Sequence, residues 1–345
     1  MTIKNTAKVL FTLSMLLLTS CGGSSSSKNI DTDPDGTILP TSIEEILENA
    51  VDKGVDGIFV YIDQTDKLNQ SYVAGLQDKV NMLPANENSL FKIASISKLF
   101  IAVSTTKLIA EGQLSLNDTL AYWLPEIAGR IANSNTITIA HMLQHRSGIA
   151  DFDSQSGFDW QNAHTDIDKT LLYAFDKPAD FTPDSKYEYS NTNYLLLGKI
   201  LDRLLGYHHQ EYVREQILVP LEMYDTYAEL TDVDQSLLVK GYWGNIDRSE
   251  QDYAIPGGSM ISTVKDIATF IRALNTGTLL TPAEKDIYSS VYWFGHSGWL
   301  PGYQSIARYD NKIDAVVIQF INTTGDNSED IASTSYEQIL NLLRQ

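Results

Sequence analysis

The spacing of apolar residues changes several times along the chain, and each change predicts a helix or a strand. Apolar side chains follow Ser42 at helical intervals and Glu45 completes a capping box, so a helix is expected to begin there. Residues 57–62 and 71–76 are rich in β-forming residues and a polar turn separates them, which predicts a hairpin. A long helical pattern then runs from about Ser95 to Ala110.

The second half of the chain divides into a helical middle and a β-rich end. Residues 116–238 show short helical fragments separated by Pro, Gly and Asp. Strands are predicted over residues 291–294, 304–309 and 315–321, and the apolar spacing of residues 331–343 predicts a closing helix. Strands at both ends with helices between them indicate one sheet built from both ends of the folded part, with a helical lobe inserted beside it.

The composition is that of a globular protein, since 43% of the 345 residues are hydrophobic and 20% are charged. We assign residues 41–345 to one folded domain, with the helical lobe at about residues 116–240. The formal net charge of -19 gives a surface that repels phosphate backbones, which argues against a nucleic-acid partner. The same charge fits solubility or the attraction of a cationic substrate, and the sequence does not map it onto a cleft.

The N-terminus has the pattern of an export signal. Lys4 and Lys8 precede an apolar run over residues 9–18, which is too short to span a bilayer. The run ends in Leu-Thr-Ser-Cys, which resembles a bacterial lipobox, so we predict a lipoprotein signal peptide over residues 1–20 and lipidation of Cys21. An ordinary secretory cleavage site beside an incidental cysteine is the alternative. Cys21 is the only cysteine, which excludes an intramolecular disulfide.

Residues 21–40 combine the lipidated cysteine with a serine run and a polar stretch, which predicts a flexible tether. A lipid anchor at Cys21 and this tether would hold the folded domain close to a membrane. We therefore expect an exported lipoprotein of the bacterial cell envelope. Gly22 follows the cysteine where Asp is associated with inner-membrane retention, so the outer membrane is favoured if the host has one.

A candidate nucleophile lies at the start of the long helix. Ser-x-x-Lys strings start at five serines, but only Ser95 lies where a polar loop becomes a long apolar helix. A helix start favours developing negative charge, and positions i and i+3 share a face, so Lys98 can point at Ser95 Oγ. A lysine buried among apolar residues can lose its proton near neutral pH, which makes Lys98 a candidate base. The alternative is an N-capping serine with a surface lysine.

A second string, Tyr189-Ser190-Asn191, precedes another apolar helical pattern. A phenol beside an ammonium group can ionise well below its free value, so Tyr189 is a candidate to relay a proton between Ser95 and a leaving group. Asn191 can donate to a substrate amide carbonyl and is also expected to hold Lys98. The alternative for Tyr189 is a buried aromatic residue with a structural hydrogen bond.

The third string, His296-Ser297-Gly298, occurs once, and Lys-x-Gly does not occur. It follows a predicted strand start at Val291, and Gly298 has no side chain to intrude on a substrate that lies against the backbone. His296 can instead be a packing residue at the end of a strand. His141 and His145 have a spacing that can bind zinc, but no third ligand is evident, so we predict a structural role for them and no metal site.

In their order and flanks these three strings resemble the serine beta-lactamase and penicillin-binding-protein superfamily, above all its class C beta-lactamase, DD-peptidase and esterase branch. The resemblance covers nearly everything from Ser42 onward. It implies an α+β fold in which an antiparallel sheet is flanked by terminal helices and an all-helical lobe is inserted, with the active site in the groove between them. It also implies substrate binding by Asn191, His296, Ser297, Gly298 and Trp299, and an oxyanion hole formed by the backbone N–H groups of Ser95 and Trp299.

The resemblance implies a serine hydrolase that forms an acyl-enzyme on Ser95 and needs no cofactor. Its substrate would be a D-alanyl peptide from peptidoglycan, a carboxylic ester or a beta-lactam. Most beta-lactamases of the superfamily have Lys where this chain has His296, so a DD-carboxypeptidase or an esterase is favoured over a lactamase. Whether Lys98 or Tyr189 is the general base stays open. The alternative function is a non-catalytic cell-envelope protein that binds peptides on the same scaffold.

Overall fold

A computed structural model describes residues 40–345 except His164. The signal peptide predicted over residues 1–20, the lipidation site Cys21 and all but the last residue of the predicted tether lie outside these described residues. Within them, no helix combines the length and the apolar character that crossing a membrane requires.

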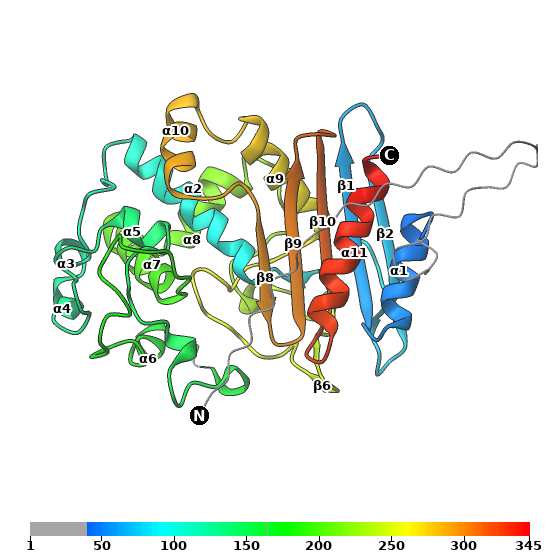
Figure 1. The fold of residues 1–345 in the computed structure, drawn as a ribbon, viewed down its shortest axis with the longest axis horizontal. Helices are drawn as coiled ribbons and strands as arrows, with labels where there is room; N and C mark the ends of the chain where they lie inside the picture. The colour runs from blue at the N-terminus through cyan, green and yellow to red at the C-terminus, as the bar shows by residue number, and fades with distance from the viewer. Residues whose placement is uncertain (1–39, 164) are drawn as a thin grey trace, which may run out of the picture. The chain divides into compact units, whose positions relative to one another are not determined.

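An antiparallel sheet of six strands forms the centre of the fold (Figure 1). Its order is β3-β2-β1-β10-β9-β8, so strands from the two ends of the domain meet in the middle, where Ile58 pairs with Ile321. The predicted sheet built from both ends is therefore confirmed. The strands are β1 (Gly57–Gln64), β2 (Gln70–Asp78), β3 (Leu83–Pro84), β8 (His296–Leu300), β9 (Tyr303–Asp310) and β10 (Ala315–Ile321).

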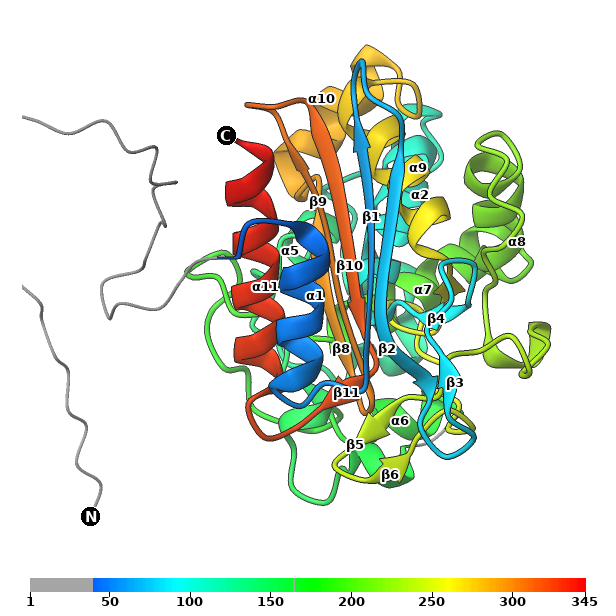
Figure 2. The ribbon, with the colours of Figure 1, turned by 90° about the vertical axis from the view of Figure 1, so that its right-hand side faces the viewer.

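The two terminal helices, α1 (Ile43–Asp52) and α11 (Ser328–Leu343), cover one face of this sheet (Figure 2). The Ser42 side chain caps α1 by accepting a hydrogen bond from Glu45 N, as the sequence predicts. One cluster of buried apolar side chains joins both helices to the sheet, with Leu47 and Ile339 from the helices and Val317 from the strands.

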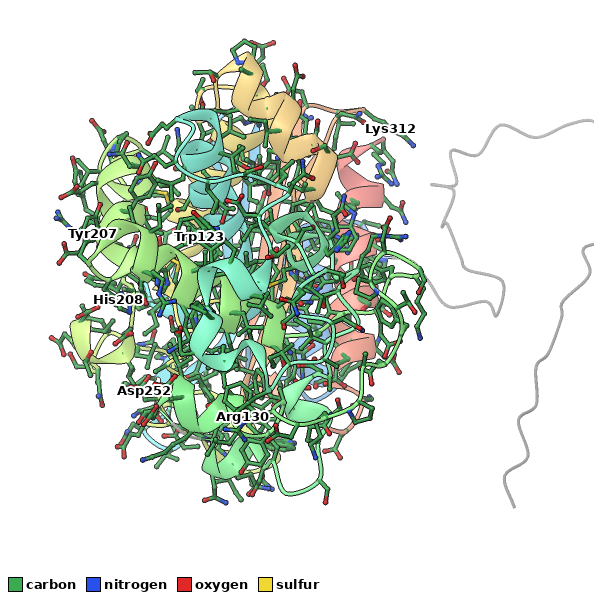
Figure 3. All side chains as sticks on the ribbon, turned by 90° about the vertical axis from the view of Figure 1, so that its left-hand side faces the viewer. Trp123, Arg130, Tyr207, His208, Asp252 and Lys312 are labelled. Atoms are coloured by element: carbon green, nitrogen blue, oxygen red, sulfur yellow. The ribbon has the colours of Figure 1, made fainter. Side chains whose placement is uncertain are left out.

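The other face is covered by α2 (Ser97–Ala110) and α9 (Val264–Thr276), and the helical lobe lies beyond them (Figures 1 and 3). The fold class predicted from the sequence is confirmed. Helices α3 to α8 fall within residues 116–240, and the remaining short strands form a three-stranded sheet, β11-β5-β6, and a pair, β4-β7. These elements are α3 (Leu120–Trp123), α4 (Pro125–Ala128), α5 (Ile139–Leu143), α6 (Ile167–Leu171), α7 (Thr192–Leu205), α8 (His209–Val213), β4 (Phe91–Lys92), β5 (Tyr242–Trp243), β6 (Ile246–Asp247), β7 (Ile261–Ser262) and β11 (Thr323–Thr324).

The structure corrects the predicted strand over residues 291–294. Val291 is the last residue of a helix, α10 (Pro282–Val291), and the strand β8 begins only at His296. The helix forms because Thr281 and Glu284 make a capping box around Pro282, which is at the first helical position. A short apolar run at a helix end has the same local composition as a buried strand, so the run alone gives the wrong element.

Candidate active site

Ser95 lies in a short 3-10 turn, η1 (Ala94–Ile96), which leads directly into α2. The predicted helix thus begins two residues later than expected. Ser95 Oγ accepts two hydrogen bonds, one from Lys98 Nζ at 2.9 Å and one from the Tyr189 hydroxyl at 3.0 Å. The three residues predicted to be catalytic are therefore brought together, although Tyr189 is 94 positions from Ser95.

Lys98 is buried beneath Ser95, and its Nζ also donates a hydrogen bond of 3.0 Å to the carbonyl oxygen of Gly257. Burial lowers the pKa of Lys98 to about 7, while the charges of Asp151 and Asp153 partly oppose this shift. A substantial fraction of the side chain is then a neutral amine near neutral pH. Such an amine, within hydrogen-bond distance of a hydroxyl, can act as its base.

Tyr189 has a different protonation from the one expected. Burial raises its pKa above the ordinary value, because desolvation outweighs every favourable contact that the phenolate would have. The expectation of an ionised phenol is wrong, since the neighbouring Lys98 is itself shifted toward its neutral form. Tyr189 is therefore a neutral hydroxyl, which can pass a proton on by giving one and receiving another.

The His145 ring packs against the Tyr189 ring, a contact that was not predicted from the sequence. The two rings stack with 4.2 Å between centroids, and His145 Nδ1 accepts a hydrogen bond from Ser190 N. Burial lowers the pKa of His145 to about 2, so it is neutral. His141 instead closes a capping box with Thr138 at the start of α5, and both contacts agree with the structural role predicted for the two histidines.

Asn191 faces an acidic pair. Its Nδ2 donates to Asp153 Oδ2 at 3.0 Å, and its backbone N–H donates to Asp151 Oδ1 at 2.9 Å. The expected contact between Asn191 and Lys98 is absent from the hydrogen bonds of the described residues, because Gly257 takes that place. Burial and the charge of Asp153 raise the pKa of Asp151 to about 7. Neither carboxylate was predicted, and two aspartates in a loop give no signal of their own.

The edge strand β8 carries the third string, and Gly298 brings it against the turn that holds Ser95. A Cβ on Gly298 would lie 2.5 Å from the Ile93 carbonyl oxygen and 2.9 Å from Ala94 Cβ. The glycine is therefore required by packing inside the protein, which differs from the predicted reason, close approach of a substrate. Since β8 is the last strand of the described sheet, no further strand lies beside it, and its outer side can pair with an extended ligand.

The side chains on β8 are neutral or tied to other elements. Burial lowers the pKa of His296 to about 4, so this position carries no fixed positive charge at neutral pH. The Nδ1 of His296 contacts the carbonyl oxygen of Ser297. Trp299 Nε1 donates to Glu329 at 2.8 Å, which fixes the indole beside Trp160.

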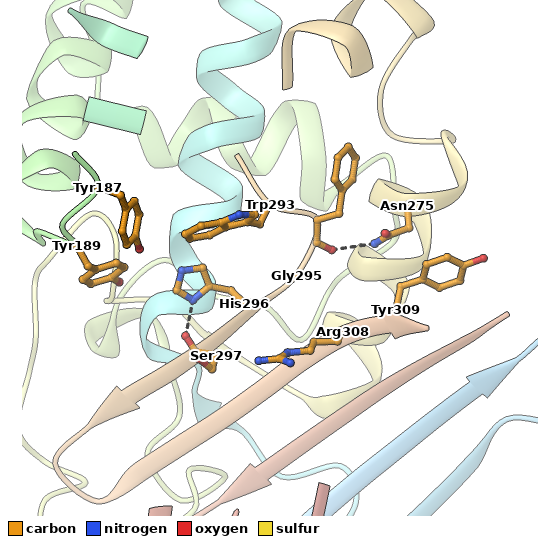
Figure 4. A pocket seen from close by; sticks show the side chains of 10 residues that line it. Tyr187, Tyr189, Asn275, Trp293, Gly295, His296, Ser297, Arg308 and Tyr309 are labelled. Carbon is orange, nitrogen blue, oxygen red and sulfur yellow. Dashed lines mark hydrogen bonds between the residues drawn. The ribbon is translucent and has the colours of Figure 1, made fainter. Parts of the chain in front are cut away.

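One cavity of about 550 Å³ unites these groups. The lining includes Asp151 and Asp153, which the sequence analysis did not predict, and Gly257, whose carbonyl oxygen accepts a hydrogen bond from Lys98. It also includes all eight residues predicted for catalysis or substrate binding: Ser95, Lys98, Tyr189, Asn191, His296, Ser297, Gly298 and Trp299. A second cavity of similar size shares Tyr189, His296 and Ser297 with it (Figure 4).

The chain is similar to known proteins in sequence and in fold. A family model described as Beta-lactamase matches residues 43–290. Protein flp of Staphylococcus aureus (strain MW2) is 25% identical over 334 residues; the match covers 87% of this chain and 66% of that protein's length. The structure of D-amino acid amidase from Ochrobactrum anthropi SV3 has a TM-score of 0.78 at 22% identity, covering 88% of this chain and 98% of the amidase. That of a penicillin binding protein from Bacillus halodurans has a TM-score of 0.71 at 19% identity, covering 87% and 99%.

Proposed function

This chain belongs to the beta-lactamase family, and from that membership and the geometry of the cavity we propose that it is a serine hydrolase that forms an acyl-enzyme on Ser95. The resemblance to the wider superfamily of serine beta-lactamases and penicillin-binding proteins is thereby confirmed. The observation that carries the proposal is the pair of hydrogen bonds that Lys98 and Tyr189 donate to Ser95 Oγ. A buried lysine whose pKa lies near 7, placed beside this serine, indicates a catalytic role for the serine over a structural one.

In the proposed reaction Ser95 Oγ attacks the substrate carbonyl carbon while its proton passes to the neutral amine of Lys98. The backbone N–H groups of Ser95 and Trp299 stabilise the oxyanion. When the tetrahedral intermediate collapses, the bond to the leaving group breaks. Tyr189 gives its proton to the leaving group and takes one from Lys98. Water then attacks the acyl-enzyme by the same route, which restores Ser95 and releases the acid.

The proposed substrates are D-alanyl peptides such as those of peptidoglycan, carboxylic esters and beta-lactams. Similarity to a D-amino acid amidase adds amides of D-amino acids to this group. A beta-lactam is disfavoured because the neutral His296 gives its carboxylate no fixed charge partner. No step needs a metal or an organic cofactor.

We also propose that the chain is exported as a lipoprotein. The support is the sequence pattern of residues 1–20 and Cys21, which would anchor the domain at the cell envelope near peptidoglycan. The outer membrane is favoured where the host has one. The net charge of -19 continues to argue against a nucleic-acid partner.

The proposal is tested with one preparation assayed on p-nitrophenyl acetate, D-alanyl-D-alanine, D-phenylalanine amide and nitrocefin. We expect release of product from at least one of the first three, and a loss of about 10³-fold or more in the Ser95→Ala variant. Ser104→Ala is the matched control, because Ser104 starts another Ser-x-x-Lys string inside α2 and its hydroxyl has no partner among the described residues.

Full activity in Ser95→Ala would refute the assignment of the nucleophile. Saturable binding of these compounds without release of product would instead favour the alternative, a non-catalytic envelope protein that binds peptides.

A further inference from the structure

The second cavity, of about 550 Å³, has no role in the chemistry above. It shares Tyr189, His296 and Ser297 with the cavity around Ser95, so the two adjoin (Figure 4). Ser95, Asn191 and Trp299 line only the first cavity. A ligand that reaches the second cavity therefore extends past His296, away from the proposed oxyanion hole.

Two large aromatic side chains form walls of this cavity. Tyr187 precedes α7 and Trp293 follows α10, and they are 46% and 52% exposed. Their rings meet edge to face with 5.6 Å between centroids. The hydrogen bond from Asn275 Nδ2 to the Phe294 carbonyl oxygen fixes the segment that carries Trp293. Two fixed but exposed aromatic rings beside a cavity are suited to contact a flat apolar group.

An arginine without a partner lies in the same cavity. Arg308 is exposed on β9, and within residues 40–345 as described its guanidinium has no hydrogen bond or ion pair. Every other arginine in that part of the chain donates to a carboxylate or an amide oxygen, as Arg272 does to Asp63 and Arg344 to Asp310. In Figure 4 the guanidinium extends toward Ser297. Gly295 lies beside Arg308 and has no side chain to fill the space.

The proton path indicates which part of a substrate faces this cavity. In the proposed reaction Tyr189 delivers the proton to the leaving group, and Tyr189 lines both cavities. The oxyanion hole at Ser95 and Trp299 holds the acyl carbonyl on the side of the first cavity. The acyl part then occupies the first cavity, and the leaving group points past Tyr189 and His296 into the second.

We propose that the second cavity is a leaving-group subsite that takes an aromatic ring bearing a negatively charged substituent. The inference rests on the proposed function, since it assigns the leaving group by the acyl-transfer geometry. The ring contacts Tyr187 and Trp293, and the anion pairs with the planar guanidinium of Arg308. Because His296 is neutral, Arg308 is the cation of this cavity that remains available.

Paired esters test the subsite by kinetics. Phenyl acetate and 4-carboxyphenyl acetate share their acyl group, and kcat/KM for each is divided by its uncatalysed rate at the same pH. We expect the carboxylated ester to be preferred at least tenfold, and Arg308→Gln to lower this preference at least tenfold. Lys312→Gln is the control, because it removes one exposed positive charge at the turn after β9 and should keep the preference. Equal corrected rates in the wild type, or an unchanged preference in Arg308→Gln, would overturn the subsite.

Calorimetric titration separates this proposal from the proposed function, because it needs no turnover. 4-Hydroxybenzoate is titrated into the wild type and Ser95→Ala, with phenol as the uncharged comparison. We expect 4-hydroxybenzoate to bind both proteins at least tenfold more tightly than phenol, and Arg308→Gln and Trp293→Ala each to weaken it at least tenfold. Thermal unfolding checks that both variants are folded. If no ester is hydrolysed but this binding pattern is observed, the hydrolase proposal is refuted and the subsite is supported. If esters are hydrolysed but 4-hydroxybenzoate binds no more tightly than phenol, the subsite is refuted and the hydrolase proposal stands.

Discussion

The groups around Ser95 have shifted pKa values because most of them are buried. The shifts bring the pKa of Lys98 to about 7 and that of His296 to about 4, while Tyr189 stays protonated. Both Lys98 Nζ and the Tyr189 hydroxyl are hydrogen-bonded to Ser95 Oγ, but only Lys98 has a substantial neutral, proton-accepting form near neutral pH, since Tyr189 keeps its proton. At the residue scale the structure therefore favours Lys98 over Tyr189 as the general base.

Replacing Lys98 by Met removes this base but keeps most of its buried volume. We expect kcat to fall by about 10²–10⁴-fold, the usual contribution of a positioned general base. The matched control is Lys107→Met on the same helix, where the lysine pairs with Glu284 away from the cavity. Steady-state kinetics of both variants test this prediction. Near-normal turnover by Lys98→Met would show that another group is the general base.

The pH dependence follows from the pKa of Lys98. Its neutral form is the active one, so kcat/KM should rise as the pH increases through about 7. The negative charges of Asp151 and Asp153 both favour the protonated lysine, so the double variant Asp151→Asn, Asp153→Asn should move this rising limb to lower pH. The exposed Asp168, paired with Lys199, provides the control Asp168→Asn. A shift of the rising part of the kcat/KM profile to higher pH would contradict the assignment of Lys98 as the general base.

The eight predicted site residues were accessible from the sequence because motifs and helix position identify them. Asp151, Asp153 and His145 were not, since only tertiary packing brings them to Tyr189 and Asn191. The expected ionised Tyr189 was wrong for a related reason. Burial determines the pKa of Tyr189, and the burial of one side chain cannot be predicted from the residues next to it in the sequence.

At the scale of elements, the close packing of β8 on the η1 turn positions the nucleophile. Gly298→Ala would place a methyl group against the Ile93 carbonyl and the side chain of Ala94. We expect a loss of about 1–3 kcal/mol in the free energy of unfolding, as for overpacked sites, and a lower kcat because Ser95 shifts. Urea unfolding and ester hydrolysis measure the two effects.

The control for Gly298→Ala is Gly129→Ala at the end of α4. An added Cβ there meets nothing within 4 Å, and the backbone is in the right-handed region. It should change stability by about 0.5 kcal/mol or less. Similar losses in the two variants would show that β8 does not press on the nucleophile turn.

The elements themselves were predictable where a regular pattern extends over several turns or strands. Alternation and helical spacing gave β1, β2, β9, β10 and both terminal helices. The sequence analysis did not predict α9 or α10, which follow loops and begin at the caps Thr263 and Thr281. Cap residues alone are too common to define a helix, so a short apolar run was assigned to a strand instead.

At the scale of the whole molecule, the sheet joins strands separated by more than two hundred residues. The order of strands and helices along the chain predicted one sheet built from both ends, but no local pattern specifies that β1 pairs with β10 or in which register. The sequence likewise does not predict which charged side chains line the two cavities. The structure locates three carboxylates, those of Asp151, Asp153 and Glu329, in the lining of the first cavity and the unpaired guanidinium of Arg308 in that of the second, within a chain of net charge -19.

The proposed lipid anchor is tested on the full chain in a bacterial host. We expect the wild type to incorporate labelled palmitate and to partition into the detergent phase, because the lipid supplies most of the membrane affinity. Cys21→Ser should lose the label and move to the aqueous phase, whereas Ser24→Ala in the tether should behave as the wild type. Equal partitioning of wild type and Cys21→Ser would contradict the anchor.

The central claim is that the hydroxyl of Ser95 attacks the substrate, and covalent labelling tests it most directly. A fluorophosphonate reacts with an activated serine, forming an O–P bond and releasing fluoride. We expect mass spectrometry of digested wild type and Ser104→Ala to locate one adduct on Ser95, and Ser95→Ala to remain unlabelled. An adduct that persists undiminished in Ser95→Ala, or that maps to another residue in the wild type, would contradict the account.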